Sequence, residues 1–310
     1  MIVTVTANPS LDRTIEVDRL RRGEVQRAQN ARVDAGGKGV NVSRALVANG
    51  RATRAVLSAG GHAGIELIAL LDAARVPVTE VPVAGGVRSN LTLAEADGTV
   101  TKLNEAGPVL DAAEAAALLD AAARSGADWI AGCGSLPPGV GTGFYATLVD
   151  RAHAAGAKSV VDSSGPAFEA CLAAGPDLVK PNLEELAEAA RMPIATLGDA
   201  VKAAEALRDA GAGAVLASLG ADGAILVEAG GVWHAKAPLA RPVASTVGAG
   251  DAALAGFLAA GGQGPNALAA AVAWGTAAVA LPGSIMPAPH DIDLDAVETT
   301  AAPAASRILS

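Results

Sequence analysis

The sequence predicts a three-layer α/β/α fold, in which a doubly wound, mostly parallel sheet lies between two layers of helices. Short runs rich in β-branched residues alternate with alanine-rich stretches of helical length over most of the 310 residues. This alternation is typical of strands joined by right-handed helical crossovers. Two further segments alternate polar and apolar residues at strand spacing, and they predict a small antiparallel β-sheet that covers the main body as a lid.

The strands expected in the main sheet are short and apolar. They lie at residues 2–6, 55–58, 129–132, 159–162, 177–179, 215–218 and 224–228. Alanine-rich segments between them favour helices, for example at residues 39–48, 111–124, 183–191, 197–209 and 250–260. In such sheets ligands bind beyond the carboxyl ends of the strands, so residues at those ends are the first candidates for a site.

The lid is expected in two insertions, at about residues 12–34 and 88–105. Each insertion holds a pair of candidate strands, at residues 14–17 with 29–33 and at residues 90–95 with 99–103. The second pair surrounds Asp97-Gly98, the strongest short signal for a hairpin.

The chain shows no internal repeat and no linker, so residues 1–310 are expected to form a single domain. Residues 252–289 contain no Asp, Glu, Lys or Arg, but Gly261-Gly262 interrupts them, and the longer half, residues 267–281, is too short to span a bilayer. Two buried helices are therefore expected there. The last residues, 301–310, carry little pattern and are expected to fray.

Composition and charge exclude several functional classes. The chain has 23 basic and 32 acidic residues, a net charge of −9, and only three Trp, three Phe and one Tyr. It therefore has neither the basic footprint nor the aromatic platforms of a nucleic-acid-binding protein, and no membrane partner is expected. Two cysteines, Cys133 and Cys171, are too few for a disulfide framework and indicate a reducing, cytoplasmic compartment.

A glycine-rich turn, Gly36-Gly37-Lys38-Gly39, leads directly into the first predicted helix. Free backbone N–H groups and the positive end of the helix dipole meet there, and Lys38 adds a charge, so the turn could bind an anion. A tight strand-to-helix connection explains a lone glycine cluster equally well. A P-loop is excluded because Gly39 follows Lys38 where Ser or Thr is required.

A second small-residue turn, Gly248-Ala249-Gly250-Asp251, opens the helix expected at residues 250–260. Asp251 could merely stabilise the helix N-terminus. It also stands beside a backbone nest suited to an oxyanion. Phosphoryl transfer to a hydroxyl needs this combination, because the carboxylate takes the proton while the amides hold the developing charge.

Asn182 and Glu185 lie three residues apart at the start of a predicted helix. Their spacing fits a capping box, in which each side chain accepts from the other's backbone N–H. It also fits an oxygen-rich corner for Mg²⁺ and its waters. The spacing alone favours the cap.

Taken together and in this order, the three motifs resemble those of the PfkB, or ribokinase-like, family of carbohydrate kinases over essentially the whole chain. Further stretches resemble the phosphosugar branch of that family, and most of all its 1-phosphofructokinases. These are residues 6–14 (TANPSLDRT), 88–90 (RSN), 103–108 (LNEAGP) and 134–139 (GSLPPG). Ser245 stands where the ribokinase and adenosine kinase branches usually have an acidic residue, which agrees with the phosphosugar branch.

The resemblance implies a ribokinase-like fold and ATP-dependent phosphorylation of fructose 1-phosphate to fructose 1,6-bisphosphate, with Mg²⁺. A 6-phosphofructokinase or a tagatose-6-phosphate kinase is the alternative within the family. Asp251 would be the general base, and Gly248, Ala249 and Gly250 would form the anion hole. A homodimer through the lid is compatible with the resemblance.

The remaining site residues follow from the same motif matches. The resemblance assigns the sugar phosphate to Asp12, Arg27, Gly37, Lys38, Asn41, Arg88, Asn90 and Ser135. It expects Arg27, Lys38 and Arg88 to gather at the existing phosphate, although Arg88 could instead be a solvated surface charge. It assigns the nucleotide to Lys180, Asn182, Ser218, Gly220, Thr246, Gly248 and Gly250. It assigns Mg²⁺ to Asn182 and Glu185.

Two other functional classes would require different residues in the sequence. A binding protein that had lost catalysis would lack Asp251 or the glycine nest, and both are present. A dinucleotide-dependent oxidoreductase would carry G-x-G-x-x-G after the first strand, where Asn8-Pro9-Ser10 stands instead.

Overall fold

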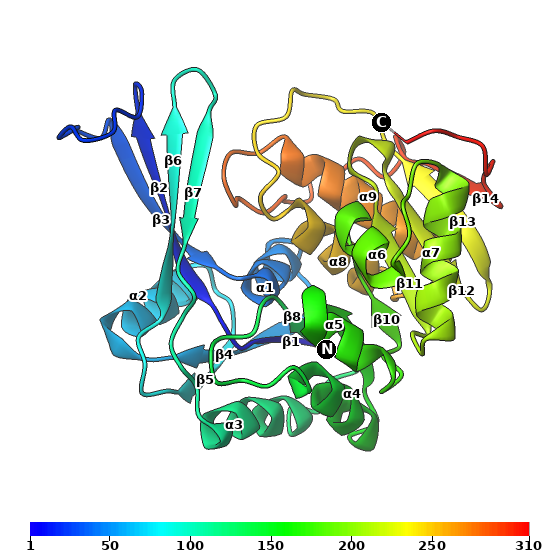
Figure 1. Cartoon of the computed structure of the whole chain (residues 1–310), viewed down its shortest axis with the longest axis horizontal. Helices are drawn as coiled ribbons and strands as arrows, with labels where there is room; N and C mark the ends of the chain where they lie inside the picture. Colours follow the sequence, from blue (N-terminus) through cyan, green and yellow to red (C-terminus); the bar gives the residue numbers. More distant parts are fainter. Residues whose placement is uncertain (310) are drawn as a thin grey trace.

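The structure is a computed structural model that describes residues 1–309, and it contains two sheets (Figure 1). The strands of the larger sheet are β1 (Ile2–Thr6), β4 (Thr53–Ala59), β5 (Val78–Pro82), β8 (Trp129–Cys133), β9 (Lys158–Asp162), β10 (Leu178–Val179), β11 (Ala214–Ser218), β12 (Ala224–Glu228), β13 (Gly231–Lys236) and β14 (Glu298–Ala301). Their order is β14-β13-β12-β11-β10-β9-β8-β1-β4-β5. Neighbours from β5 to β11 pair in parallel, and β11 to β14 pair antiparallel.

Helices cover both faces of this sheet. They are α1 (Lys38–Ala48), α2 (Gly61–Ala73), α3 (Ala112–Ala123), α4 (Phe144–Ala154), α5 (Gly165–Leu172), α6 (Leu183–Ala190), α7 (Leu197–Asp209), α8 (Ala249–Ala259) and α9 (Gly264–Val279). One core lies between the sheet and α3 to α7, and a second lies between the sheet and α1, α8 and α9. The predicted three-layer, mostly parallel fold is thus confirmed.

The second sheet consists of β2 (Ser10–Val17), β3 (Asn30–Gly36), β6 (Arg88–Glu95) and β7 (Val100–Asn104), in the order β3-β2-β6-β7. Both predicted antiparallel pairs form, and the central pair, β2 with β6, is parallel. The sheet rises from the body as the blue and cyan arrows of Figure 1. Because β2 follows β1 and β3 runs into α1, the lid begins at the carboxyl end of β1.

The chain end differs from the sequence-based expectation. The N–H groups of Leu197 and Gly198, in the first turn of α7, donate to the carbonyls of Arg307 and Ala305, at 2.8 and 2.9 Å. Leu309 N–H donates to Ala195 O at 3.0 Å. The expectation that this segment frays is wrong for the described residues, because it satisfies helix N–H groups that lack intrahelical partners.

Three strands, β5, β13 and β14, were not predicted. The strand β14 (ETTA) is fully exposed at the sheet edge, so it carries no apolar pattern. Within residues 1–309, no helix combines the length and the apolar character that crossing a bilayer requires.

Candidate active site

Asp251 lies in the first turn of α8 and is buried, with 7% of its surface exposed. Gly248 caps this helix with φ 78°, in the left-handed region that favours glycine. The helix therefore turns sharply away from the preceding loop. The first backbone N–H groups of a helix have no intrahelical partner, so this turn presents free donors beside the Asp251 carboxylate.

The Asp251 carboxylate has one hydrogen-bonding neighbour on α1. Asn41 Nδ2 donates to Asp251 Oδ2 at 2.9 Å. Burial, together with the nearby Asp162 carboxylate, raises the pKa of Asp251 to about 6, against the lowering effect of Asn41 and two lysines. The group is therefore ionised at neutral pH yet basic enough to accept a proton.

Asp162, at the carboxyl end of β9, holds two ammonium groups at the floor of the site. Its carboxylate lies 2.8 Å from Lys38 Nζ and 3.0 Å from Lys180 Nζ, and it is fully buried. Burial alone would raise the pKa of Asp162, but the two ammonium groups outweigh it and lower the pKa below its ordinary value. No motif in the sequence singles out Asp162, although its position at a strand end is the signal that marks such sites.

Lys180 connects this ion-pair cluster to the glycine turn. A Cβ added to Gly250 would lie 3.3 Å from Lys180 Nζ. The ammonium group therefore lies directly above the turn that precedes Asp251. A positive charge and free N–H groups converge on this point, which suits a phosphoryl group.

Asn182 and Glu185 form the capping box that their spacing favours. Asn182 Oδ1 accepts from Glu185 N at 2.8 Å, and Glu185 Oε2 accepts from Asn182 N at 2.9 Å. The other carboxylate oxygen, Glu185 Oε1, lies 3.5 Å from Lys38 Nζ. Burial lowers the pKa of Lys38, but the carboxylates of Asp162 and Glu185 outweigh it and raise the pKa above its ordinary value.

The lid contributes a polar cluster around Asp12. Asp12 Oδ1 accepts from Ser10 Oγ at 2.7 Å and from Asn90 Nδ2 at 2.9 Å. The carboxylate lies against Gly36, where an added Cβ would collide with it. Any side chain at this position would have to displace the Asp12 carboxylate, which glycine leaves in place.

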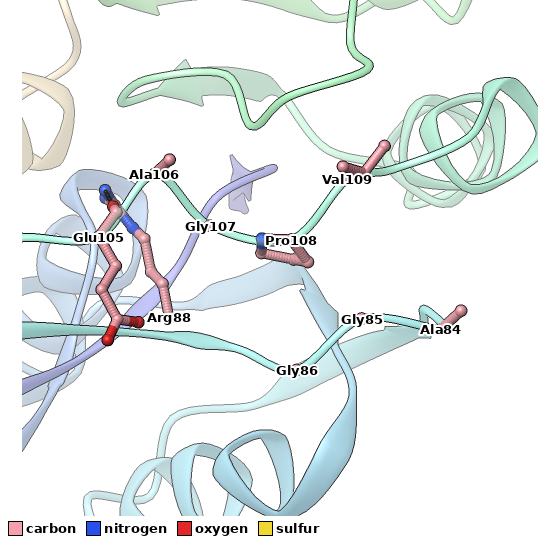
Figure 2. Close-up of a pocket in the computed structure, with 9 residues that line it drawn as sticks. All are labelled: Ala84, Gly85, Gly86, Arg88, Glu105, Ala106, Gly107, Pro108 and Val109. Carbon is pink, nitrogen blue, oxygen red and sulfur yellow. Dashed lines mark hydrogen bonds between the residues drawn. The ribbon is translucent and has the colours of Figure 1, made fainter.

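Arg88 lies at the base of β6, at one end of an open pocket of about 560 Å³. Figure 2 shows residues 84–86 and 105–109 on opposite sides of this pocket, with the Arg88 side chain reaching toward Ala106. Arg88 Nη1 donates to Glu105 O at 3.0 Å. Burial lowers the pKa of Arg88, while the carboxylates of Asp12 and Glu105 raise it.

The structure holds the three predicted phosphate-binding cations in three different places. Lys38 points inward to Asp162, Arg88 contacts the Glu105 carbonyl, and Arg27 lies exposed in the connection between β2 and β3. The single cluster predicted from the motifs is therefore not formed within this chain, because Lys38 is held by the buried Asp162 and the partly buried Glu185.

The other predicted residues lie along the same edge of the sheet. Gly37 caps α1 and packs against Thr6, and Ser135 Oγ accepts from Asn8 Nδ2 at 3.4 Å. Among the residues that the motifs assign to the nucleotide, Ser218 N donates to Pro181 O at 3.1 Å, and Gly220 opens the short helix Gly220–Asp222. Thr246 O accepts from Ala249 N at 3.4 Å, at the start of α8.

Arg44 is a charged residue of the site that the sequence analysis did not single out. Its guanidinium is largely buried beside Asn41, and burial lowers the pKa of Arg44 against the raising effect of Asp34, Asp12 and Asp251. It follows Asn41 by three residues on α1 and so shares its helix face. This spacing from Asn41 was the feature of the sequence that could have identified Arg44 as a site residue.

Several buried polar side-chain atoms within residues 1–309 have no hydrogen-bond partner: Thr6 Oγ1, Asn8 Oδ1, Arg88 Nε and Asn90 Oδ1. They lie at or just after the carboxyl end of β1, or near the start of β6. Buried polar atoms are almost always paired in native proteins, so such a group calls for an explanation, and a ligand that supplies the missing partners is one. These atoms are therefore candidates for contact with a polar ligand.

The model of the family described as pfkB family carbohydrate kinase matches residues 5–291. The chain belongs to this family. It is therefore a sugar kinase, a transferase of phosphoryl groups, and the family resemblance predicted from the motifs is confirmed.

Relatives of this pfkB family kinase carry phosphofructokinase names. A 1-phosphofructokinase of Haloferax volcanii is 40% identical over 94% of this chain and 95% of its own length. An ATP-dependent 6-phosphofructokinase isozyme 2 of Mycobacterium tuberculosis is 34% identical over 82% of this chain and 76% of its own length. The crystal structure of phosphofructokinase-2 from Escherichia coli in complex with potassium matches with a TM-score of 0.88 and 31% identity, over 94% of this chain and 96% of that one.

Proposed function

We propose that this kinase transfers the γ-phosphoryl group of ATP to fructose 1-phosphate and forms fructose 1,6-bisphosphate. The observation that carries the proposal is the position of Asp251. Its carboxylate is buried beside the glycine turn and interacts electrostatically with Lys38 and Lys180. A base with a raised pKa next to an anion-binding turn suits phosphoryl transfer to a hydroxyl. The 1-phosphofructokinase name of a relative at 40% identity supports the sugar.

The chemistry follows from these residues. The free hydroxyl oxygen of the sugar attacks the γ-phosphorus of ATP, and the bond from that phosphorus to the bridging oxygen of ADP breaks. Asp251 accepts the hydroxyl proton as the new P–O bond forms. The N–H groups around Gly248, Ala249 and Gly250, together with Lys180, stabilise the negative charge that spreads over the transferring group.

Mg²⁺ would be held by Asn182 and Glu185, together with water and the phosphates of ATP. Within residues 1–309, no three or more His, Cys, Asp or Glu side chains are grouped to hold a metal by themselves. Glu185 nevertheless has one oxygen outside the capping box, Oε1, and Mg²⁺ commonly takes only one or two carboxylates and keeps its waters. The residues present therefore fit the ion, which would neutralise charge on the β- and γ-phosphates.

The sugar would bind between the lid and the end of β1. Asp12, Asn41 and Asn90 would contact its hydroxyls, close to Gly37. Arg88 and Ser135 would bind its existing phosphate, and Arg27 and Lys38 would join them by leaving the positions that they hold in this structure. The unpaired Arg88 Nε and Asn90 Oδ1 support this location, because each lacks a partner that the ligand would supply.

The nucleotide would lie along the ends of β10 and β11. Lys180, Asn182, Ser218, Gly220 and Thr246 would line that side, next to Gly248 and Gly250. The added Cβ of Gly220 would meet no atom within 4 Å, which leaves its backbone open to a ligand.

A second copy of the chain would pack on the lid. One face of the lid carries Ile15 beside Leu93, and Val33 and Leu91 on either side of Arg13, as the strand register shows. Leu103 on the same face is 58% exposed. Such a row favours association through the lid, and sedimentation of the purified chain tests it.

A 6-phosphofructokinase is the second candidate, and the 34% identical relative of that name favours it. In furanose form the two fructose phosphates are nearly related by a half-turn, so either could present its free hydroxymethyl group to Asp251. The anomeric hydroxyl distinguishes them, and a buried polar group that loses its partner costs about 1–3 kcal/mol.

An ADP-release assay with Mg-ATP across fructose 1-phosphate, fructose 6-phosphate, tagatose 6-phosphate and fructose tests the proposal. We expect the highest kcat/KM for fructose 1-phosphate, poor use of fructose 6-phosphate and far worse use of free fructose. A higher value for either 6-phosphate would replace the substrate and keep the kinase.

A further inference from the structure

The guanidinium of Arg44 bridges three elements around the proposed base. Its Nη1 lies 3.1 Å from Ala35 O at the end of β3 and 3.1 Å from Asn41 Oδ1 on the same helix. It also lies 3.5 Å from Ser284 Oγ, in the loop after α9. One side chain thus joins the lid, helix α1 and the loop that packs on the glycine turn through Met286.

The contact with Asn41 has a chemical consequence. A guanidinium can only donate hydrogen bonds, so an amide that bonds to it must present its oxygen and not its nitrogen. The Asn41 amide must therefore turn Oδ1 toward Arg44, which leaves Nδ2 facing Asp251. We propose that Arg44 is a positioning residue, which fixes the orientation of the Asn41 amide and thereby the hydrogen bond to the base Asp251. This inference deepens the proposed function, on which it rests.

The orientation matters because the two ends of the amide act oppositely on a carboxylate. A donor at Asp251 favours its ionised form, whereas an amide oxygen there favours the protonated form. Other charged groups act on Asp251 from every side, and they are the same in both orientations. These groups are Asp162 at the end of β9, Lys180 after β10, and Lys38 and Arg44 on α1.

A purely structural role for Arg44 is the rival explanation. Arg44 also lies close to Asp34 and Asp12, and it donates to the Ala35 carbonyl, so it could serve only to hold the lid on α1. In that case its removal would loosen the lid and weaken sugar binding without changing the titration of Asp251.

A double-mutant cycle on the unliganded protein separates the two roles. The probe is the ¹³Cγ signal of Asp251 in protein labelled at its aspartates, assigned by its absence from Asp251→Asn and followed against pH. The variants are Arg44→Met, Asn41→Leu and the double variant. Arg32→Met is the matched control, because Arg32 pairs with Asp34 at 2.7 Å and also lies close to Arg44, yet no hydrogen bond joins it to Asn41.

We expect Arg44→Met to raise the midpoint of Asp251 by about one pH unit, since a hydrogen bond to the charged form is lost. In the Asn41→Leu background the same change should move the midpoint much less, because only the direct effect of the Arg44 charge on Asp251 remains. Arg32→Met should leave the midpoint in place. Arg44→Lys, which keeps the charge and a donor, should recover most of the wild-type value and serves if the methionine variant does not fold.

Equal shifts in both backgrounds, or no shift in Arg44→Met, would overturn the proposal. In kinetics, the acid limb of kcat should move to higher pH in Arg44→Met with the KM for ATP unchanged. The titration needs no substrate, so its failure is distinct from failure of the proposed function. Failure of the proposed function would appear instead as catalytic activity in the Asp251→Asn variant.

Discussion

Replacing Asp251 by Asn should inactivate the enzyme and stabilise its fold. The change keeps the shape of the side chain and removes the proton acceptor, so kcat should fall by about 10²–10⁴. The stability effect follows from the pKa of Asp251, which burial raises from 3.8 to about 6. A carboxyl group whose folded pKa lies above its unfolded value destabilises the protein once it is ionised.

The size of this effect follows from the shift. A pKa difference of this size corresponds to roughly 3 kcal/mol, which the ionised carboxylate costs at neutral pH. The cost is absent below the unfolded pKa, near pH 4, where the group is protonated in both states, and it is complete above pH 6. Asp251→Asn should therefore exceed the unfolding free energy of the wild type by less than about 1 kcal/mol at pH 4 and by up to about 3 kcal/mol at pH 7.5.

Urea denaturation followed by tryptophan fluorescence measures this difference, since Trp129 and Trp274 are nearly buried. The series should run from pH 4 to pH 8 for both proteins. A variant that is less stable than the wild type at pH 7.5, or a difference that does not shrink on acidification, would refute the reasoning. A variant that keeps more than a tenth of the wild-type kcat would refute the role as base.

The other predictions concern the phosphate, the metal and the helix turn. Arg88→Ala should raise the KM for the sugar phosphate about 10–100-fold and leave the KM for ATP nearly unchanged, because only a charge-assisted contact to the sugar's phosphate is lost. Equal changes in both KM values would show that Arg88 does not bind the sugar's phosphate specifically. Glu185→Gln should raise the Mg²⁺ concentration for half-maximal activity; a lower melting temperature with unchanged Mg²⁺ dependence would assign Glu185 to the capping box alone. Gly248→Ala forces an L-residue to φ 78° and brings its Cβ to 2.7 Å from Met286 Cε, so it should lose about 1–2 kcal/mol of stability in the same urea assay; an unchanged midpoint would show that the turn relaxes freely.

The order of elements and the site motifs were predictable because they are local. Strand β1 has the predicted bounds, because its five apolar or β-branched residues are buried on both faces. The glycine turn before Asp251 was predictable for a similar reason, since a left-handed cap needs glycine in the sequence itself. The capping box of Asn182 and Glu185 follows from a spacing of three.

Partners distant in the chain were decided only by the tertiary structure. Asp162 binds Lys38 across 124 positions, and Asn41 donates to Asp251 across 210. No local pattern specifies such a pair, because the parallel sheet brings the carboxyl ends of strands together whatever their distance in sequence. The pairing of Lys38 with buried carboxylates, in place of the expected cluster with Arg27 and Arg88, has the same cause: a partly buried ammonium group binds the nearest carboxylate, and only packing sets which one that is.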